Sequence, residues 1–240
     1  MKHYTWFYLD KPLWNNAFSF EQRKNKKLWV PELIDANITD IQLGKEVVFE
    51  DFGFDDQLST NTGLKNFYHI KWKGKDIYLF DNHNHAYYFW YLARHQNIIW
   101  DNNTLIHVDE HADTRDPWEY LMKPDSYDMD NVFHYTNYVY NVWNYIVPAE
   151  KEGLITKTIQ VRNTHNLEEY LDLRSTLGSD IIFNLDLDFF QPDLDFIDYD
   201  LKKKVCLDAA KKAKIITVAT SPFFINQELA LRVFNEIFGE

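Results

Sequence analysis

Apolar runs and helical periodicities alternate along the chain from residue 76 onward. Continuous apolar runs, typical of strands covered on both faces, predict buried strands at 77–80, 105–108, 181–183 and 215–219. Apolar side chains recur at helical spacing in 86–93, 132–147, 201–213 and 227–238. Residues 67–72 and 76–80 flank Lys73-Gly74-Lys75, a hairpin signal with glycine in the turn. The pattern predicts an α/β fold: a three-layer sandwich around a mostly parallel central sheet.

The first 65 residues lack this regular alternation. They are rich in aromatic residues, and only Val47–Phe49 suggests a strand. We therefore expect residues 1–65 to be an N-terminal elaboration. Because 240 residues are ordinary for one domain, we expect a single domain over 1–240.

Polar clusters follow three predicted strands at their carboxyl ends. They are Asp81-Asn82-His83-Asn84-His85, Asp109-Glu110-His111-Ala112-Asp113 and Asn184-Leu185-Asp186-Leu187-Asp188. In parallel sheets, ligands bind beyond these ends of the strands. Adjacent buried carboxylates repel each other and are costly without a cation. The three clusters therefore predict one shared metal site.

The ligand types indicate which metal this site would hold. The candidates are Asp109, His111, Asp113, Asp186 and Asp188, with His83 or His85 adding an imidazole. Carboxylates mixed with imidazole favour manganese or iron over a structural zinc. Six side chains exceed the three or four that hold one catalytic ion, so we expect two ions that share carboxylates and activate water. Taken singly, an Asp-x-Asp pair is common in loops, and a single histidine is more often a core or capping residue.

Composition narrows the function further. The net charge of −12 leaves no basic stripe for nucleic acid and favours a cationic substrate, although solubility alone would also explain it. The single cysteine, Cys206, excludes a disulfide within the chain and a thiolate metal cluster. No Gly-rich phosphate loop is present. With no signal peptide or long apolar segment, we expect a cytoplasmic protein that does not bind membranes.

Two of the clusters resemble the signature motifs of a known family. Asp109-x-His111-x-Asp113 and Asn184-x-Asp186-x-Asp188 look like those of the ureohydrolase superfamily, which includes arginases and agmatinases, over about residues 76–225. The resemblance implies an arginase-like fold and two Mn²⁺ ions bridged by Asp109 and Asp186. It implies His111 and Asp188 on one ion and Asp113 on the other. His83 best matches the remaining ligand, and His85 is the alternate.

The chain also departs from true arginases. Phe80-Asp81-Asn82-His83-Asn84 replaces their glycines and Asp-His-Ser, and the late glutamate that holds the guanidinium has no counterpart. Tyr135-Thr136-Asn137 and Thr220-Ser221-Pro222 resemble the divergent branch that includes the peptide arginases. Those enzymes convert arginine residues of a ribosomally made precursor peptide to ornithine.

The resemblance therefore implies a manganese-dependent peptide arginase that acts on an arginine-containing precursor peptide. We expect His85 or His134 to protonate the leaving amine, and Glu110 or Asp116 to bind the guanidinium. A peptidyl arginine lacks free amino and carboxylate ends, so its pocket should be more open and contact the flanking peptide. The alternatives are another amidinohydrolase or a deacetylase acting on a small molecule, and a non-catalytic peptide-binding relative.

Overall fold

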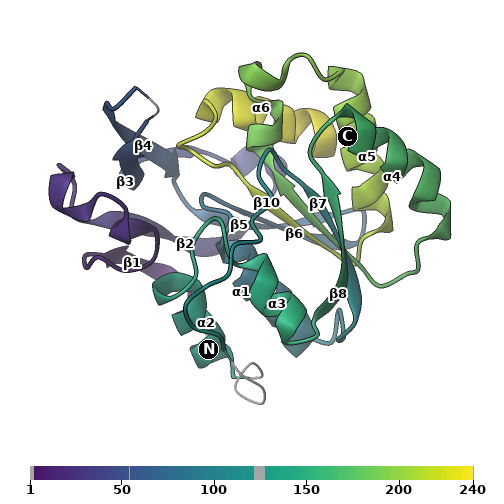
Figure 1. Cartoon of the computed structure of the whole chain (residues 1–240), viewed down its shortest axis with the longest axis horizontal. Coiled ribbons are helices and arrows are strands. Elements are labelled where there is room, and N and C mark those ends of the chain that lie inside the picture. The colour runs from purple at the N-terminus through teal and green to yellow at the C-terminus, as the bar shows by residue number, and fades with distance from the viewer. Residues whose placement is uncertain (1–2, 54, 122–127, 240) are drawn as a thin grey trace.

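An eight-stranded, mostly parallel sheet runs through the centre of the protein (Figure 1). The computed structural model describes residues 3–53, 55–121 and 128–239. The order of the strands in this sheet is β1-β2-β5-β6-β10-β9-β7-β8. Their bounds are β1 Thr5–Leu9, β2 Leu28–Ala36, β5 Phe67–Trp72, β6 Lys75–Phe80, β7 Asn103–Val108, β8 Ile155–Val161, β9 Ile181–Asp186 and β10 Ile215–Ala219. The expected α/β class with a mostly parallel central sheet is confirmed.

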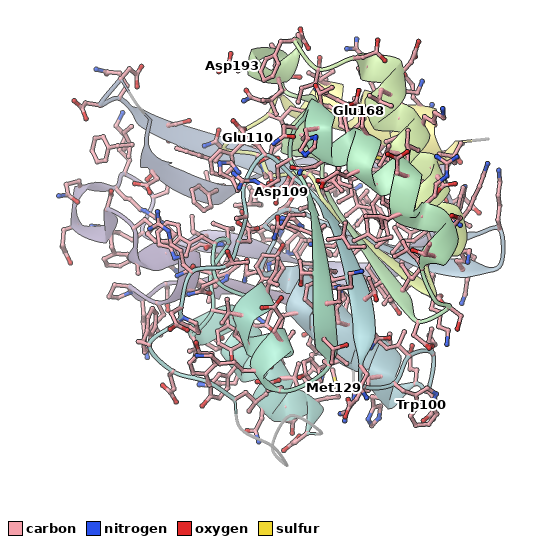
Figure 2. All side chains as sticks on the ribbon, turned by 45° about the vertical axis from the view of Figure 1, so that its right-hand side comes forward. Trp100, Asp109, Glu110, Met129, Glu168 and Asp193 are labelled. Atoms are coloured by element: carbon pink, nitrogen blue, oxygen red, sulfur yellow. The ribbon has the colours of Figure 1, made fainter. Side chains whose placement is uncertain are left out.

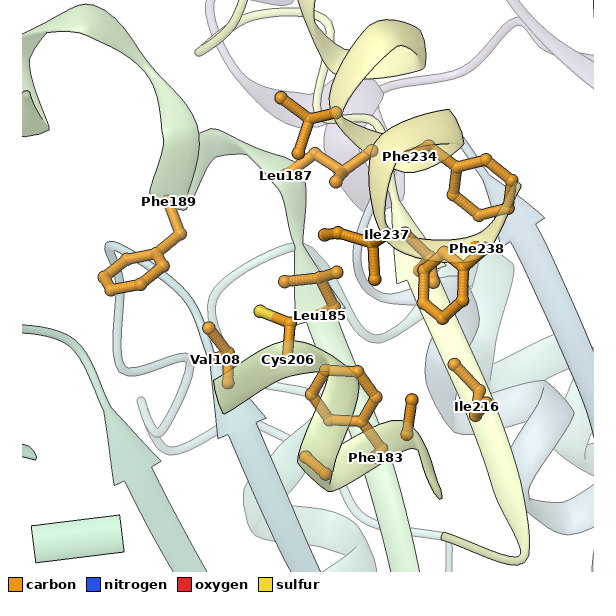
Figure 3. Packing of buried hydrophobic residues seen from close by; sticks show 14 of the residues in the cluster. Val108, Phe183, Leu185, Leu187, Phe189, Cys206, Ile216, Phe234, Ile237 and Phe238 are labelled. Atoms are coloured by element: carbon orange, nitrogen blue, oxygen red, sulfur yellow. The ribbon is translucent and has the colours of Figure 1, made fainter. Parts of the chain in front are cut away.

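Helices cover both faces of this sheet and so form three layers (Figure 1). One face carries α1 His85–His95, α2 Met129–Tyr138 and α3 Ile146–Lys151, and the other carries α4 Thr164–Leu173, α5 Tyr199–Lys212 and α6 Gln227–Phe238. Successive strand residues point to opposite faces, so Phe183 and Leu185 of β9 pack towards α5 and α6, beside Cys206 and Phe234 (Figure 3). Ile182 belongs to the second core, which includes the tyrosines of α1.

The hairpin predicted around Lys73-Gly74-Lys75 is confirmed. β5 and β6 pair in antiparallel register from Tyr68↔Leu79 to Trp72↔Lys75. Lys73 and Gly74 have φ values of 48° and 80°, the left-handed conformation that a tight hairpin turn requires at both central positions.

The N-terminal region corrects one prediction. Only one strand was expected before residue 65, but β1 and β2 belong to the central sheet. Two further strands, β3 Leu43–Phe52 and β4 Leu58–Leu64, form a separate antiparallel hairpin. The single strand expected at Val47–Phe49 is thus the middle of a longer one. In β1 the aromatic residues Trp6, Phe7 and Tyr8 are consecutive, so the strand shows no alternation of apolar and polar side chains.

The helix expected over residues 132–147 was also wrong in extent. The chain leaves the helical conformation after Tyr138 and starts α3 only at Ile146. Val139 ends the first helix with φ −123° and ψ −50°. Within the described ranges, no helix combines the length and apolarity that a bilayer crossing needs.

Candidate metal centre

Strand register brings the polar clusters together at one edge of the sheet. Ala219 of β10 pairs with Phe80 of β6 on one side and with Asp186 of β9 on the other. On the far side of β9, Leu185 pairs with Val108 of β7, so Asp109 and Asp186 are the next residues along neighbouring strands. Figure 2 shows Asp109 and Glu110 at this edge, away from Trp100 and Met129. The sheet therefore places the three clusters at the same level, as the sequence predicted.

His83 lies at the centre of a carboxylate group. Its Nδ1 is 2.9 Å from Oδ2 of Asp109, 3.2 Å from Oδ2 of Asp113 and 3.1 Å from Oδ2 of Asp186. All four residues are buried. Neither ring nitrogen of His83 has a hydrogen bond of good geometry with the described residues. One nitrogen and three oxygens thus converge on a common point.

A second group forms around the other oxygen of Asp109. Nδ1 of His111 lies 3.5 Å from Oδ1 of Asp109 and 3.0 Å from Oδ2 of Asp188. These three side chains offer ligand atoms close enough to hold an ion. His111 is half-buried and packs against the ring of Phe224 at 4.7 Å between ring centres. Asp109 therefore faces His83 with one oxygen and His111 with the other.

The donor set fits divalent ions. Asp109, Asp113, Asp186 and Asp188 are all less than 10 % exposed, and across residues 3–53, 55–121 and 128–239 their only ion-pair partners are histidines. Four buried carboxylates without a lysine or arginine are costly, because ionised groups lose hydration there. Hard oxygen ligands mixed with imidazole are those that manganese accepts. Two such ions would offset the charge.

The pKa values of the carboxyl groups in this cluster are shifted in opposite directions. Burial, together with the neighbouring charge of Asp109, raises the pKa of Asp113 to about 7. Burial and Asp186 raise the pKa of Asp188 well above its usual range. Burial opposes ionisation of Asp109 as well, but contacts with His111 and His83 lower the pKa of this carboxyl. Without bound cations, repulsion between the buried carboxylates destabilises the cluster, and cations would reduce that repulsion.

In the segment from Asp81 to His85, His83 is the residue whose side chain contacts the carboxylates of the site. Asp81 accepts a hydrogen bond from the backbone N–H of Leu64 at 2.7 Å, and Asn82 donates to the carbonyl of Val48 at 3.2 Å. Both contacts attach the β3–β4 hairpin. The side chain of Asn84 donates to the Thr136 carbonyl on α2 at 2.8 Å. The neighbouring polar residues are thus anchors that fix His83.

His85 does not reach the site, so its expected roles as alternate ligand and proton shuttle are corrected. Nδ1 of His85 contacts the hydroxyl of Tyr4 at 2.7 Å, inside a cage that includes Trp14 and Phe67. Burial lowers the pKa of His85 to about 3 and keeps the ring neutral. His85 is the first residue of α1, whereas His83 lies in the turn before the helix, and the contact with Tyr4 holds the His85 ring away from the carboxylates.

The other expected catalytic residues have mixed outcomes. His134 is exposed on α2 beside Tyr138, and it does not line the cavity at the carboxylates. Asp116 is also exposed and pairs with Lys151 at 3.0 Å. Glu110 does lie at the site: its carboxylate accepts from Gln191 at 3.0 Å, and its backbone N–H donates to Asp188 at 3.3 Å.

His107 was missed because it lies within an apolar strand run. Trp90 donates to the hydroxyl of Thr217 at 3.1 Å, and Thr217 donates to Oδ1 of Asn184 at 2.7 Å. An indole N–H can only donate, so this order fixes the Asn184 amide, whose nitrogen then donates to Nδ1 of His107 at 3.0 Å. Burial lowers the pKa of His107 to about 3, so the neutral ring carries its proton on Nε2. Nε2 faces Oδ2 of Asp109 at 3.3 Å.

This tautomer decides the role of His107. Its Nε2 lies near His83 and Asp109 and could be taken for a metal ligand. A protonated ring nitrogen cannot bind a metal. The side chain is therefore a positioning residue that presents an N–H to Asp109, comparable with the outer partners that orient metal ligands.

Two residues of the site have strained backbones. Asp113 has φ 51° and Ser221 has φ 42°. The hydroxyl of Ser221 donates to Oδ2 of Asp186 at 2.5 Å, and the Ser221 backbone N–H donates to the Asp81 carbonyl at 2.9 Å. Non-glycine residues in this conformation concentrate at functional sites, where the surrounding structure holds them.

Two adjoining hollows open at the carboxylates. The first has a volume of about 280 Å³, and its lining includes His83, Asp113, Asp186, Val142 and Trp143. The second, of about 560 Å³, lies beside the β3–β4 hairpin, and its lining includes Asp55, Glu110, Asp193 and Phe223. His111 and Phe224 line both. The smaller hollow has room for one long side chain, and the larger one has room for a short extended peptide segment.

No protein-family model and no curated protein sequence matches this chain. The interpretation of the site therefore depends on its own geometry.

Proposed function

We propose that the protein is a manganese-dependent hydrolase that converts arginine residues of a ribosomally made precursor peptide to ornithine and releases urea. The observation that carries this proposal is the convergence at His83, whose Nδ1 lies within 3.2 Å of oxygens from Asp109, Asp113 and Asp186. The adjacent group of His111 and Asp188 around Asp109 supports a second ion.

Each predicted ligand has a place in this arrangement. His83 and Asp113 would hold one ion, His111 and Asp188 the other, and Asp109 and Asp186 would lie between them. When bound, such a pair of ions lowers the pKa of water and supplies a nucleophile near neutral pH.

The remaining residues of the hollow would bind the substrate. A guanidinium that enters the smaller hollow would lie next to the ions that Asp113 and Asp186 are proposed to hold. Val142 and Trp143 line the same hollow and would exclude water from the aliphatic part of the side chain. Ser221 holds the Asp186 carboxylate through its hydroxyl. Guanidino hydrolysis consumes one water and leaves the amine of ornithine and urea, so no redox partner is required.

The adjoining hollow favours a peptide over a free amino acid. It begins at the shared residues His111 and Phe224 and continues past Glu110 along the β3–β4 hairpin. An extended chain could lie there while one arginine side chain enters the smaller hollow.

The test is hydrolysis by the purified protein loaded with Mn²⁺. An arginine-containing peptide, free arginine and agmatine are supplied separately, and urea and the peptide mass are measured. We expect urea and an ornithine-containing peptide from the first substrate and little urea from the other two. Efficient hydrolysis of free arginine or agmatine alone would show a small-molecule amidinohydrolase. Asp186→Asn controls for contaminating activity and should release no urea.

A further inference from the structure

Two arginines line the smaller hollow opposite its carboxylate floor. They are Arg115 and Arg162, and both side chains are exposed, whereas Asp113 and Asp186 at the floor are buried. The hollow is therefore negative at its base and positive at its mouth. A site for a simple cation would not need this second feature, because two guanidinium groups repel an incoming one.

Both guanidinium groups are held in place by contacts with the backbone or with a ring. Arg115 lies over the ring of Trp143, with Cζ 5.1 Å from the ring centre, and its backbone N–H donates to the Trp143 carbonyl at 3.0 Å. Arg162 donates to the carbonyl of Glu110 from Nε and Nη2, each at 3.0 Å. These contacts orient the arginines without neutralising them.

Neither arginine has a carboxylate partner within the part of the chain that the structure describes. Acidic residues outnumber basic ones by 37 to 25, so nearby carboxylates are abundant. Asp116, next to Arg115 in sequence, pairs with Lys151 instead. The Glu110 carboxylate accepts from Gln191, while Arg162 takes only the Glu110 carbonyl. Two oriented and uncompensated guanidinium groups at the mouth of a site are suited to a carboxylate.

We propose that Arg115 and Arg162 bind a carboxylate of the substrate, so that the preferred arginine has an acidic group beside it. This inference depends on the proposed function and specifies its substrate. The carboxylate can come from an aspartate or glutamate adjacent to the arginine in a peptide, or from the α-carboxylate of an arginine at a free C-terminus. In either case the guanidinium would lie next to the ions held by Asp113 and Asp186, and the anion would stay at the mouth.

The experiment compares substrates that carry or lack this carboxylate. The Mn²⁺-loaded full chain is given acetyl-Gly-Arg-Asp-Gly-amide, its asparagine counterpart, and acetyl-Gly-Arg with a free C-terminus. We expect kcat/KM for the aspartate peptide to exceed that for the asparagine peptide by about 10-fold, mainly through KM, because a charge-assisted contact is lost. A preference for the free C-terminus alone would assign the carboxylate to the peptide end.

Substitutions then assign the effect to the two arginines. Arg115→Gln combined with Arg162→Gln should bring the ratio between the aspartate and asparagine peptides close to one. Arg232→Gln, which changes an exposed arginine of α6, should keep the preference of the unsubstituted protein. Thermal unfolding and manganese content verify that the double variant is folded and loaded.

Binding provides a readout that is independent of turnover. Ornithine-containing versions of the three peptides are titrated by calorimetry into the same proteins, and the carboxylate should again lower Kd by about 10-fold only where the arginines are present. Equal turnover and equal binding of all three peptides would overturn this proposal while leaving the proposed function intact. If no guanidino compound is hydrolysed, the proposed function fails, and the calorimetric comparison still decides whether the arginines bind a carboxylate.

Discussion

Nδ1 of His83 lies 3.1 Å from Oδ2 of Asp186, although His83 follows β6 and Asp186 ends β9, and these two strands are not neighbours in the sheet. β10 separates β6 from β9 and pairs with both, and Ala219 is in register with Phe80 and with Asp186. The loop after β6 must therefore cross the end of β10 to bring His83 to Asp186. Asp81 and Ser221 hold that crossing, since the Ser221 N–H donates to the Asp81 carbonyl at 2.9 Å.

Asp186→Asn should abolish stabilisation of the protein by Mn²⁺. An ion that binds only the native state stabilises it by about 2.7 kcal/mol at 100 times its Kd. Removing the carboxylate that lies 3.1 Å from His83 should remove that gain, whereas the metal-free protein should melt at the same or a higher temperature because one charge that repels Asp188 is gone. Thermal unfolding with and without Mn²⁺ measures both effects. Asp172→Asn, an exposed position on α4, is the control and should retain the full shift.

The metal-free protein should lose stability as pH rises. The raised pKa values of Asp113 and Asp188 mean that the native state keeps protons that the unfolded chain releases above about pH 4. The contribution of these two carboxyls to the free energy of unfolding therefore falls as pH rises from about 4 towards 7. Buried neutral His85 and His107, whose pKa burial lowers to about 3, contribute in the opposite direction up to about pH 6.5, so the net loss is expected above that pH. For His111, burial is outweighed by Asp109 and Asp188, which raise its pKa to about 11, so its contribution is also lost as pH rises above about 6.5.

Melting curves of the chelator-treated protein should thus show a higher Tm at about pH 5.5 than at about pH 8. With Mn²⁺ the trend should reverse, because the ion binds deprotonated ligands more tightly. A metal-free Tm that is equal at both values, or higher at the upper one, would contradict the electrostatic account of the cluster.

Substitutions of His107 should separate positioning from metal binding. His107→Gln can still present an N–H towards Asp109, whereas His107→Phe cannot. We expect Mn²⁺ affinity to fall by roughly 10- to 100-fold in the phenylalanine variant and by much less in the glutamine variant. Metal titration by calorimetry measures the affinity. A loss of one bound ion per chain in both variants would show instead that His107 is a ligand.

Gly63 should tolerate no side chain. A Cβ at this position would lie within 3 Å of the Asp81 carboxylate, which anchors the β4 end to the site loop, and of Val48. Gly63→Ala should therefore destabilise the protein by about 1–3 kcal/mol through overpacking and weaken Mn²⁺ binding by shifting Asp81. Gly178→Ala is the matched control, because a Cβ there meets open space and should leave unfolding unchanged.

The strands that carry the site could be predicted because they are buried on both faces. Continuous apolar runs in β6, β7, β9 and β10 leave few alternative interpretations, and the polar cluster that ends each strand marks its carboxyl end. β2 was harder to predict, because it contains Pro31 and two charged residues, Glu32 and Asp35. Its residues Leu28–Glu32 pair with β1 and Leu33–Ala36 with β5, so Pro31 precedes the β5 ladder. No local pattern reveals such a change of partner.

Side-chain direction was the part of the site that the sequence could not supply. The sequence alone does not distinguish His83 from His85 as the metal ligand. The contact between Tyr4 and His85 at the start of α1 shows which of the two faces away from the carboxylates. His107 was concealed by the apolar residues on either side of it in β7. Arg115 and Arg162 lie in loops after different strands, and their meeting at one hollow depends on β7 and β8 being neighbours.

The central claim is best tested by the anomalous scattering of manganese in crystals of the protein grown with Mn²⁺. The account predicts two peaks per chain, one beside His83 and Asp113 and the other beside His111 and Asp188, with Asp109 and Asp186 between them. Full-occupancy density at these positions would establish the ligand set. Absence of a peak among these six residues, or manganese bound only elsewhere, would contradict it.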